Sequence, residues 1–342
     1  MRLTSRMLFE AREAPSAVAG QLAHDTDRYD ALGRLLRDQP PRSLLTVARG
    51  SSDHAAHFAA YLVMARLGRL VTSLPMSLLT LYQSKIDCDG LASFAFSQSG
   101  QSPDLVAPTR YFRNGGAITC AFVNDAASPL ARASEWVFPL HAGEEASVAA
   151  TKSFIAQLVA GARLAAAWQH DEVLVRGLRH LPEALRDAAQ ADWSPALETL
   201  RDADRLLVVG RGLGLPVALE AALKFKEVCG IQAEAFSGAE IQHGPMALIE
   251  AGYPLLIFAP RGPAQPGLLE LADAMRERGA NVLLAAPPDT RGAQLALTGA
   301  AAVELDPICA IQSFYPMVEA LARERGLDPD KPRHLRKVTR TQ

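Results

Sequence analysis

The amino-acid sequence predicts an α/β protein made of two tandem subdomains, each a doubly wound parallel sheet between two layers of helices. Short apolar runs rich in β-branched residues alternate with longer stretches of helical character, as in parallel strands joined by helices. The pattern also occurs twice along the chain. One shift aligns glycines of the two halves in pairs: Gly50 with Gly212, Gly68 with Gly230, and Gly100 with Gly262.

The elements are expected in the same order in each half. A first strand is predicted at 44–48 and again at 206–210, each followed by a glycine turn and a long helix. Two further strands are predicted in each half, at 92–96 and 117–123, then at 255–259 and 281–286. A helix over 152–169 and a polar connecting helix close the first half, which places the link near 190–194.

These elements divide the chain into four parts. We predict an N-terminal helical segment at 1–40, a first subdomain at 41–190, a second subdomain at 195–325 and a C-terminal tail at 326–342.

The composition excludes several classes of function. The 342 residues are 49% hydrophobic and 21% charged, with a net charge of -2, which is typical of a soluble protein large enough for two domains. Near-neutral charge gives no support for nucleic acid or an anionic membrane as a partner. No apolar run is long enough for a membrane span, and the four cysteines are scattered. A reducing cytoplasm is therefore the expected location.

The most informative segment is Ser97-Gln98-Ser99-Gly100-Gln101-Ser102, which follows the strand predicted at 92–96. A helix is expected to open at Ser102, because Pro103 is tolerated in a first helical turn. Such a junction presents free backbone N–H groups, hydroxyls and the positive end of a helix dipole to one point. These groups suit a phosphate monoester, although an ordinary capped helix is the alternative. The second half has Ala259-Pro260-Arg261-Gly262 instead, so the phosphate site is predicted only in the first.

Three charged residues are expected to share one helix face. Glu220, Lys224 and Glu227 are four and three residues apart, which brings their side chains together on a helix. Lysine is rare in this arginine-rich chain, and lysine can form a Schiff base whereas arginine cannot. A surface ladder of ion pairs is the alternative, but apolar neighbours such as Ala221 and Phe225 favour burial. A partly buried carboxylate beside an ammonium is suited to proton abstraction.

Six segments, in order along the chain, resemble the sugar isomerase (SIS) family, in particular the isomerase domain of glutamine–fructose-6-phosphate aminotransferase. They are Arg49-Gly50-Ser51-Ser52-Asp53-His54-Ala55, the serine segment above, Val148-Ala149-Ala150-Thr151-Lys152, Leu219-Glu220-Ala221-Ala222-Leu223-Lys224-Phe225-Lys226-Glu227, Glu240-Ile241-Gln242-His243-Gly244-Pro245, and Pro332-Arg333-His334-Leu335-Arg336-Lys337. The resemblance implies two SIS subdomains of the flavodoxin-like α/β/α type.

The resemblance also implies an activity. Synthases of the family carry an N-terminal glutaminase domain with a nucleophilic cysteine after the initiator methionine, whereas Arg2 follows Met1 here, so we expect no such domain. Without a tethered ammonia source, mass action favours deamination, as in the SIS-type glucosamine-6-phosphate deaminases. We therefore expect conversion of glucosamine 6-phosphate to fructose 6-phosphate and ammonia, by ring opening, C1/C2 proton transfer and imine hydrolysis.

Site residues follow from the same resemblance. Glu227 is the expected base for proton transfer, with Lys224 beside it, His243 the acid and base for ring opening, and Lys337 the lysine that can form an imine with the open-chain ketose. The phosphate is expected on Ser52, Ser97, Gln98, Ser99 and Ser102. The sugar is expected on Ser51, Val148, Ala150 and Glu220.

The expected partner is a small sugar phosphate, without a metal or a cofactor. The resemblance implies a homodimer in which His243 reaches the active site of the neighbouring subunit. It also implies that the tail covers the active site, although a basic terminus is otherwise expected to be disordered.

Three departures from the family leave alternatives open. Ala150 stands where the family commonly has serine, Asp53 replaces a frequent aromatic residue, and Pro108 falls inside the helix after the serine segment. The alternative functions are a fructosamine-6-phosphate deglycase, a galactosamine-6-phosphate deaminase and a non-catalytic sugar-phosphate sensor.

Overall fold

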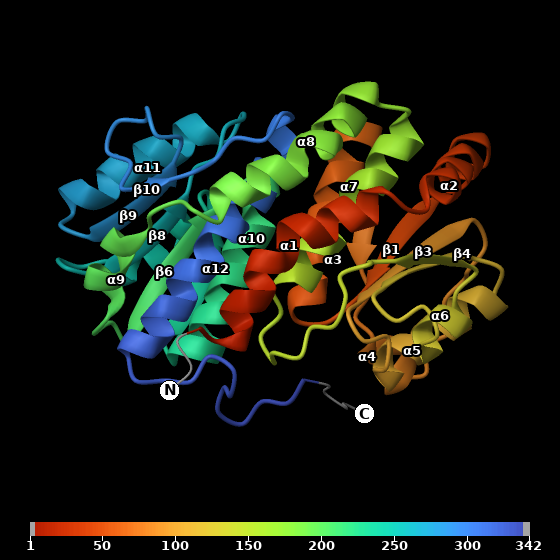
Figure 1. Ribbon diagram of the computed structural model, residues 1–342. Coiled ribbons are helices and arrows are strands. Elements are labelled where there is room, and N and C mark those ends of the chain that lie inside the picture. Colours follow the sequence, from red (N-terminus) through yellow and green to blue (C-terminus); the bar gives the residue numbers. More distant parts are fainter. Residues whose placement is uncertain (1–3, 338–342) are drawn as a thin grey trace. The chain divides into compact units, whose positions relative to one another are not determined.

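The computed structural model describes residues 4–337 and contains two compact units, each built on a five-stranded sheet (Figure 1). The first-sheet unit comprises 16–145, 152–179 and 336–337, and the second-sheet unit comprises 4–15, 146–151 and 180–335. Both sheets are parallel throughout. The predicted pair of doubly wound α/β subdomains is thereby confirmed.

The first sheet has the strand order β2-β1-β3-β4-β5. Its strands are β1 (Ser43–Val47), β2 (Val71–Ser73), β3 (Leu91–Ser97), β4 (Ile118–Val123) and β5 (Trp136–Pro139). The central strand β3 is buried along its whole length, as expected of a parallel strand covered on both faces. The chain first moves from β1 to β2 and then returns past β1 to β3, which is the flavodoxin-like winding.

Helices cover both faces of the first sheet. The helices of this unit are α2 (Thr26–Asp38), α3 (Ser51–Leu67), α4 (Ser77–Thr80), α5 (Pro103–Asn114), α6 (Pro129–Ala133) and α7 (Lys152–Gln169). One core joins α2, α3 and α7 to residues such as Phe96 and Phe122. The other joins α5 and α6 to the opposite face, through Leu105, Phe112 and Leu130.

Small residues let the helices of the first core approach closely. A side chain at Gly161 of α7 would meet the Cβ atom of Ala59 in α3 at 2.7 Å, and one at Gly33 of α2 would meet the carbonyl oxygen of Ala167 at 2.5 Å. Helix α7 is buried over nearly its whole length. It therefore packs as a fixed central helix of this unit, with its N-terminus at Lys152.

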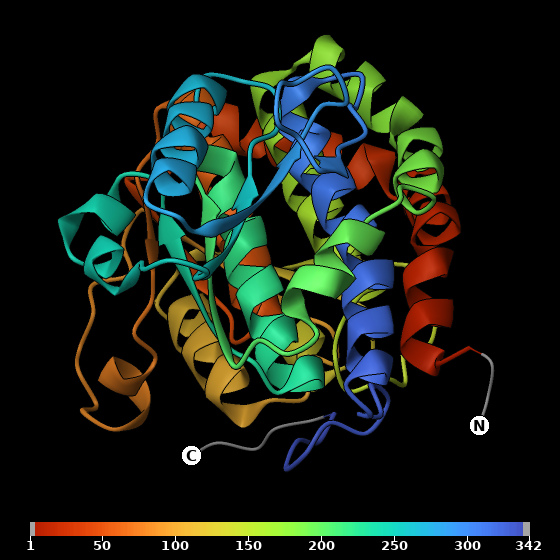
Figure 2. The ribbon, with the colours of Figure 1, turned by 90° about the vertical axis from the view of Figure 1, so that its left-hand side faces the viewer.

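The second sheet repeats the winding, with the order β10-β9-β8-β6-β7. Its strands are β6 (Arg205–Gly210), β7 (Gln232–Ser237), β8 (Pro254–Phe258), β9 (Asn281–Ala286) and β10 (Leu295–Ala296). Its helices are α9 (Ser194–Leu200), α10 (Leu215–Lys224), α11 (Gln265–Glu277) and α12 (Asp306–Glu324). The long helix α12 packs beside α10 (Figure 2).

The division between the units passes within two helices, α1 (Arg6–Leu22) and α8 (Glu172–Ala188). The parts predicted from the sequence are consecutive segments of the chain. The two compact units are instead defined by spatial contacts, so each unit contains segments that are far apart in the sequence. Residues 1–3 of the predicted N-terminal segment and 338–342 of the predicted tail lie outside the described residues.

None of the described helices combines the length and apolar character needed to span a bilayer. All four cysteines are free and buried.

The close approach of α3 and α7 gives a stability prediction. Replacing Gly161 by valine should lower the free energy of unfolding by about 1–3 kcal/mol, because the added atoms overlap Ala59 in a packed core. Replacing Gly20 of α1 by alanine is the control, since nothing lies within 4 Å of a side chain there. Thermal denaturation of the two variants measures the difference, and equal melting temperatures would show that α7 can shift away from α3.

Candidate active site

The serine segment forms a tight turn at the carboxyl end of β3. The hydroxyl of Ser97 accepts a hydrogen bond from the Gly100 N–H at 3.0 Å, and that of Ser99 accepts one from the Gln101 N–H at 3.3 Å. Gly100 has φ +62°, and a side chain there would strike the hydroxyl of Ser128 at 2.2 Å. The turn therefore requires glycine for two reasons, its backbone conformation and its contact.

The turn leads into α5 as the sequence predicts. Ser102 is the N-cap residue and Pro103 the first helical residue, yet the Ser102 side chain makes no capping hydrogen bond. Its hydroxyl and the first N–H groups of α5 are thus not used by a cap, and Ser102 is only half-buried. Such groups at a helix N-terminus suit an anion.

A second helix begins beside this turn. Helix α3 starts at Ser51 after Gly50, whose φ is +55°, which places Ser51 and Ser52 in its first turn. Its strand β1 pairs directly with β3, so α3 and α5 begin at the same edge of the sheet. An ion pair of 3.2 Å between Arg49 and the buried Asp104 joins the two starts.

This place is the topological switch point of the first sheet, where the winding reverses between β1 and β3. Ligands of doubly wound proteins bind at that point, outside the carboxyl ends of the strands. The predicted phosphate residues all come from the two strand-to-helix junctions that meet there: Ser52 from the first turn of α3, Ser97 from the end of β3, and Gln98, Ser99 and Ser102 from the turn before α5.

The equivalent point of the second sheet is filled by protein. Arg261 follows β8 and binds the Asp306 carboxylate through both of its oxygens, at 2.8 and 2.7 Å. The same guanidinium donates to the Ala300 carbonyl oxygen. The position that corresponds to the serine turn therefore holds a satisfied ion pair.

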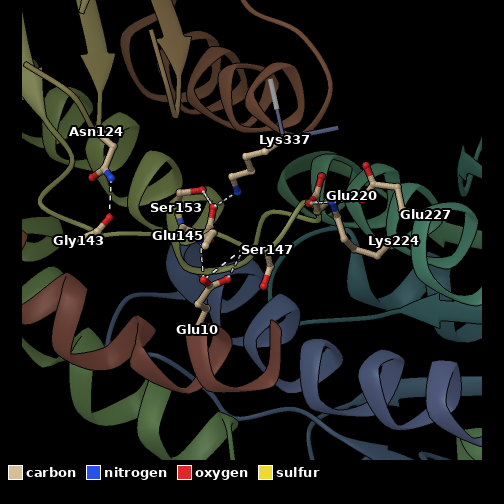
Figure 3. Close-up of polar contacts among 11 residues, drawn as sticks. Glu10, Asn124, Gly143, Glu145, Ser147, Ser153, Glu220, Lys224, Glu227 and Lys337 are labelled. Carbon is tan, nitrogen blue, oxygen red and sulfur yellow. Dashed lines mark hydrogen bonds and ion pairs between the residues drawn. The ribbon is translucent and has the colours of Figure 1, made fainter. Parts of the chain in front are cut away.

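Lys224 forms the centre of a buried charged cluster in the second-sheet unit. Its Nζ atom lies 3.2 Å from Glu220 and 2.5 Å from Glu227, and the Lys224 and Glu220 side chains are fully buried (Figure 3). Burial alone would lower the pKa of the Lys224 ammonium, but the two carboxylates outweigh it and the pKa is raised. Lys224 therefore stays charged. The shared face predicted for these three residues is confirmed.

Glu227 lies where the helix changes its winding. Helix α10 ends at Lys224, and a single π-helical turn, η2 (Phe225–Cys229), carries Glu227 before the left-handed Gly230. The sequence predicts one regular helix here, and the wider turn is a correction to it. Turns of this kind recur at functional sites. Glu227 keeps 17% of its side chain exposed, so one carboxylate of the cluster can meet a ligand.

The remaining predicted residues of this unit are on loops. His243 ends the short helix η3 (Glu240–His243) and is exposed. Val148 and Ala150 are half-buried in the segment 146–151. The Glu10 carboxylate fixes that segment by accepting the N–H groups of Ala146, at 2.7 Å, and Ser147.

Lys337 is held by a residue that the sequence analysis missed. Its Nζ atom lies 3.0 Å from the Glu145 carboxylate, in the first-sheet unit. Glu145 stands directly before the Val148–Lys152 segment, and an acidic residue near a helix start is a known signal. Asn124 was missed as well, although it follows strand β4 at the carboxyl edge that carries the serine turn.

The fold and these loops define a tandem flavodoxin-like α/β protein with one open and one filled switch point. Comparison with known families agrees, because the SIS domain model matches residues 36–167 and 199–302. The chain belongs to the SIS domain family, as its sequence motifs predict.

Two known proteins are similar to this chain in sequence. Glutamine–fructose-6-phosphate aminotransferase (isomerizing) of Methanothermobacter thermautotrophicus is 32% identical over 97% of this chain and 56% of its own length. The chain thus spans about half the length of the curated relatives it matches. A solved structure of a candidate phosphosugar isomerase from Silicibacter pomeroyi DSS-3 is 42% identical, with TM-score 0.90, covering 96% of this chain and 100% of that one.

A third comparison shows the fold alone. Glucosamine-6-phosphate deaminase of Thermotoga maritima has TM-score 0.78 at 21% identity, covering 98% of this chain and 100% of that one.

The buried cluster gives a second prediction. Replacing Lys224 by methionine leaves buried carboxylates without their counter-charge and should lower the free energy of unfolding by about 3–5 kcal/mol. The exposed Lys226 is the control, and its replacement by methionine should change stability by less than about 0.5 kcal/mol. Chemical denaturation of both variants provides the measurement.

The pH dependence tests the same cluster. Because the pKa of Lys224 is raised from 10.5, its stabilising effect is complete below that pH and is lost as the pH rises through the raised value. The gap in stability between wild type and Lys224→Met should therefore narrow at strongly alkaline pH. A gap that widens there would contradict a charged Lys224.

Proposed function

We propose that the protein is an amino-sugar-phosphate isomerase and deaminase, converting glucosamine 6-phosphate to fructose 6-phosphate and ammonia. The observation that carries the proposal is the partly exposed position of Glu227 beside the fully buried, charged Lys224. The match to aminotransferases that act on fructose 6-phosphate, over nearly the whole of this chain, supports the choice of substrate.

The switch point of the first sheet is proposed to bind the phosphate. Hydroxyl groups of Ser52, Ser99 and Ser102 and the N–H groups at the starts of α3 and α5 supply donors there. Fixing the non-reacting end of the sugar lets its binding energy position C1 and C2.

Glu227 is proposed as the base that moves the proton between C1 and C2. A base must reach substrate, and Glu227 is the exposed carboxylate of the cluster, whereas Glu220 is enclosed. The Lys224 ammonium lies 2.5 Å from Glu227 and fixes the position of its side chain, and a carboxylate so placed can accept a proton from substrate.

His243 and Lys337 complete the proposed chemistry. An exposed imidazole can give and take protons near neutral pH during ring opening, and we propose that His243 does so in the neighbouring subunit of a homodimer. The Lys337 amine is proposed to meet the open-chain sugar at C2, where imine chemistry exchanges nitrogen for oxygen.

The first experiment measures ammonia released from glucosamine 6-phosphate by wild type and by Glu227→Gln. Loss of a general base should lower kcat by about 10²–10⁴-fold, with little change in thermal stability, because the amide keeps the shape of the side chain. Glu234→Gln, an exposed residue of β7, is the control and should match wild type. Release at the wild-type rate by Glu227→Gln would refute the role of the base.

A second function, deglycation of a fructosamine 6-phosphate, is favoured by one observation. A cavity of about 1090 Å³ opens beside Glu227, far larger than ammonia requires. Basic and acidic side chains both line it, among them Arg201, Lys226, Asp204 and Arg333. A zwitterionic amino acid carries both kinds of charge, so an amino-acid substituent on the sugar suits this cavity.

Comparison of kcat/KM for the two substrates separates the two functions. A deaminase should release ammonia from glucosamine 6-phosphate with a higher kcat/KM than it releases amino acid from a fructosamine 6-phosphate adduct. The opposite ranking would establish the deglycase. In that case Arg333→Met should raise KM for the adduct and leave KM for glucosamine 6-phosphate unchanged.

A further inference from the structure

Lys337, the last described residue, makes a charged contact through its amine. Residues 333–336 before it are exposed, whereas Lys337 itself keeps only 24% of its side chain exposed. Its Nζ atom lies 3.0 Å from Oε2 of Glu145 (Figure 3). The contact orders the end of the described chain.

Glu145 is held in place by groups other than the tail. Its side chain is fully buried, its Oε1 atom accepts the Ser153 N–H at 3.1 Å, and its Oε2 atom accepts the Ser153 hydroxyl. Ser153 is itself fully buried in the first turn of α7. The carboxylate thus satisfies an N-terminal N–H group of a fixed helix, at the favourable end of its dipole.

The loop before Glu145 is fastened to the serine turn. The side chain of Asn124 accepts the Ala142 N–H at 3.0 Å and donates to the Gly143 carbonyl oxygen at 2.6 Å. The N–H of the same Asn124 donates to the carbonyl oxygen of Gln98 at 3.1 Å. One residue at the end of β4 therefore joins the proposed phosphate turn to the loop that carries Glu145.

We propose that Glu145 is a positioning residue that holds Lys337 at a fixed distance from the phosphate turn and accepts its proton during catalysis. The proposal rests on the proposed function. The sugar phosphate would be fixed at one end by the turn, and the lysine would be fixed by Glu145. Both belong to the same unit, so neither has to be brought into place by a movement of the other.

The proton balance explains why a carboxylate is needed. The paired ammonium of Lys337 has no lone pair and cannot attack C2 of the sugar. Transfer of one proton from Nζ to Oε2 gives a neutral amine, which adds to C2 of the protonated imine that C1/C2 proton transfer leaves on the open-chain sugar. The original nitrogen then leaves C2 and takes the proton from Glu145, so it departs as ammonium, the lysine imine remains on C2 and the carboxylate is restored; water later hydrolyses the lysine imine to the ketose.

The first test needs no substrate. Acylation of amines by an N-hydroxysuccinimide ester, read by mass spectrometry, compares Lys337 with the exposed Lys331 in the same protein. Glu145→Gln should raise the relative labelling of Lys337 about fivefold, the ratio for an ion pair of about 1 kcal/mol. Glu144→Gln, the same substitution at the exposed neighbouring residue, is the control. In this variant the relative labelling of Lys337 should equal that of wild type. Unchanged labelling in Glu145→Gln would overturn the proposal.

The second test measures catalysis. Glu145→Gln should lower kcat for ammonia release and leave KM nearly unchanged, because the phosphate turn still binds the sugar, and Glu145→Asp should restore part of kcat. In a Lys337→Met background, Glu145→Gln should have no further effect. Additive effects of the two substitutions would show that Glu145 does not act through Lys337. If wild type releases no ammonia, the proposed function fails, and the labelling test still decides whether Glu145 holds Lys337.

Discussion

The charge of Lys224 inside the second-sheet unit sets the conditions for the rest of the proposed site. An ammonium excluded from water is costly unless carboxylates surround it, and Glu220 and Glu227 lie within 3.2 and 2.5 Å of it. The enclosed Glu220 helps to balance this charge. Glu227, at the edge of the cluster, pairs with the same ammonium and keeps 17% of its side chain exposed, where a ligand can reach it. The π-helical turn that carries Glu227 keeps the third residue of the cluster within reach of Lys224.

The two sheets share a winding but differ at the point where a ligand would bind. In the first, a glycine at φ +62° closes a turn rich in hydroxyl groups at the switch point. In the second, the Arg261–Asp306 pair occupies the corresponding position and satisfies its own charges. The two repeats thus share an architecture and differ in the loop at the switch point, which is the serine turn in the first sheet and an ion pair in the second.

Asn124 and Glu145 connect elements that the sequence keeps far apart. Asn124 joins the serine turn to the loop after β5, and Glu145 joins that loop to α7 and to the end of the described tail. All of these contacts are polar, and those of Glu145 are made by a fully buried carboxylate, so its charge has satisfied partners. The result is a short path of hydrogen bonds from the proposed phosphate site to Lys337.

The sequence by itself determined the fold class, three strands of each repeat in their order along the chain, and the face shared by Glu220, Lys224 and Glu227. Those features follow from local periodicity and spacing, which the chain carries residue by residue. It also located the turn at Ser97–Ser102 and the proline-led helix after it. Tertiary structure alone decided that Arg261 fills the second switch point, that η2 is wound as a π-helix, and that Glu145 receives Lys337. These depend on contacts between residues distant in the sequence, such as Arg261 with Asp306 and Lys337 with Glu145, and no local pattern encodes which distant groups will meet when the chain packs.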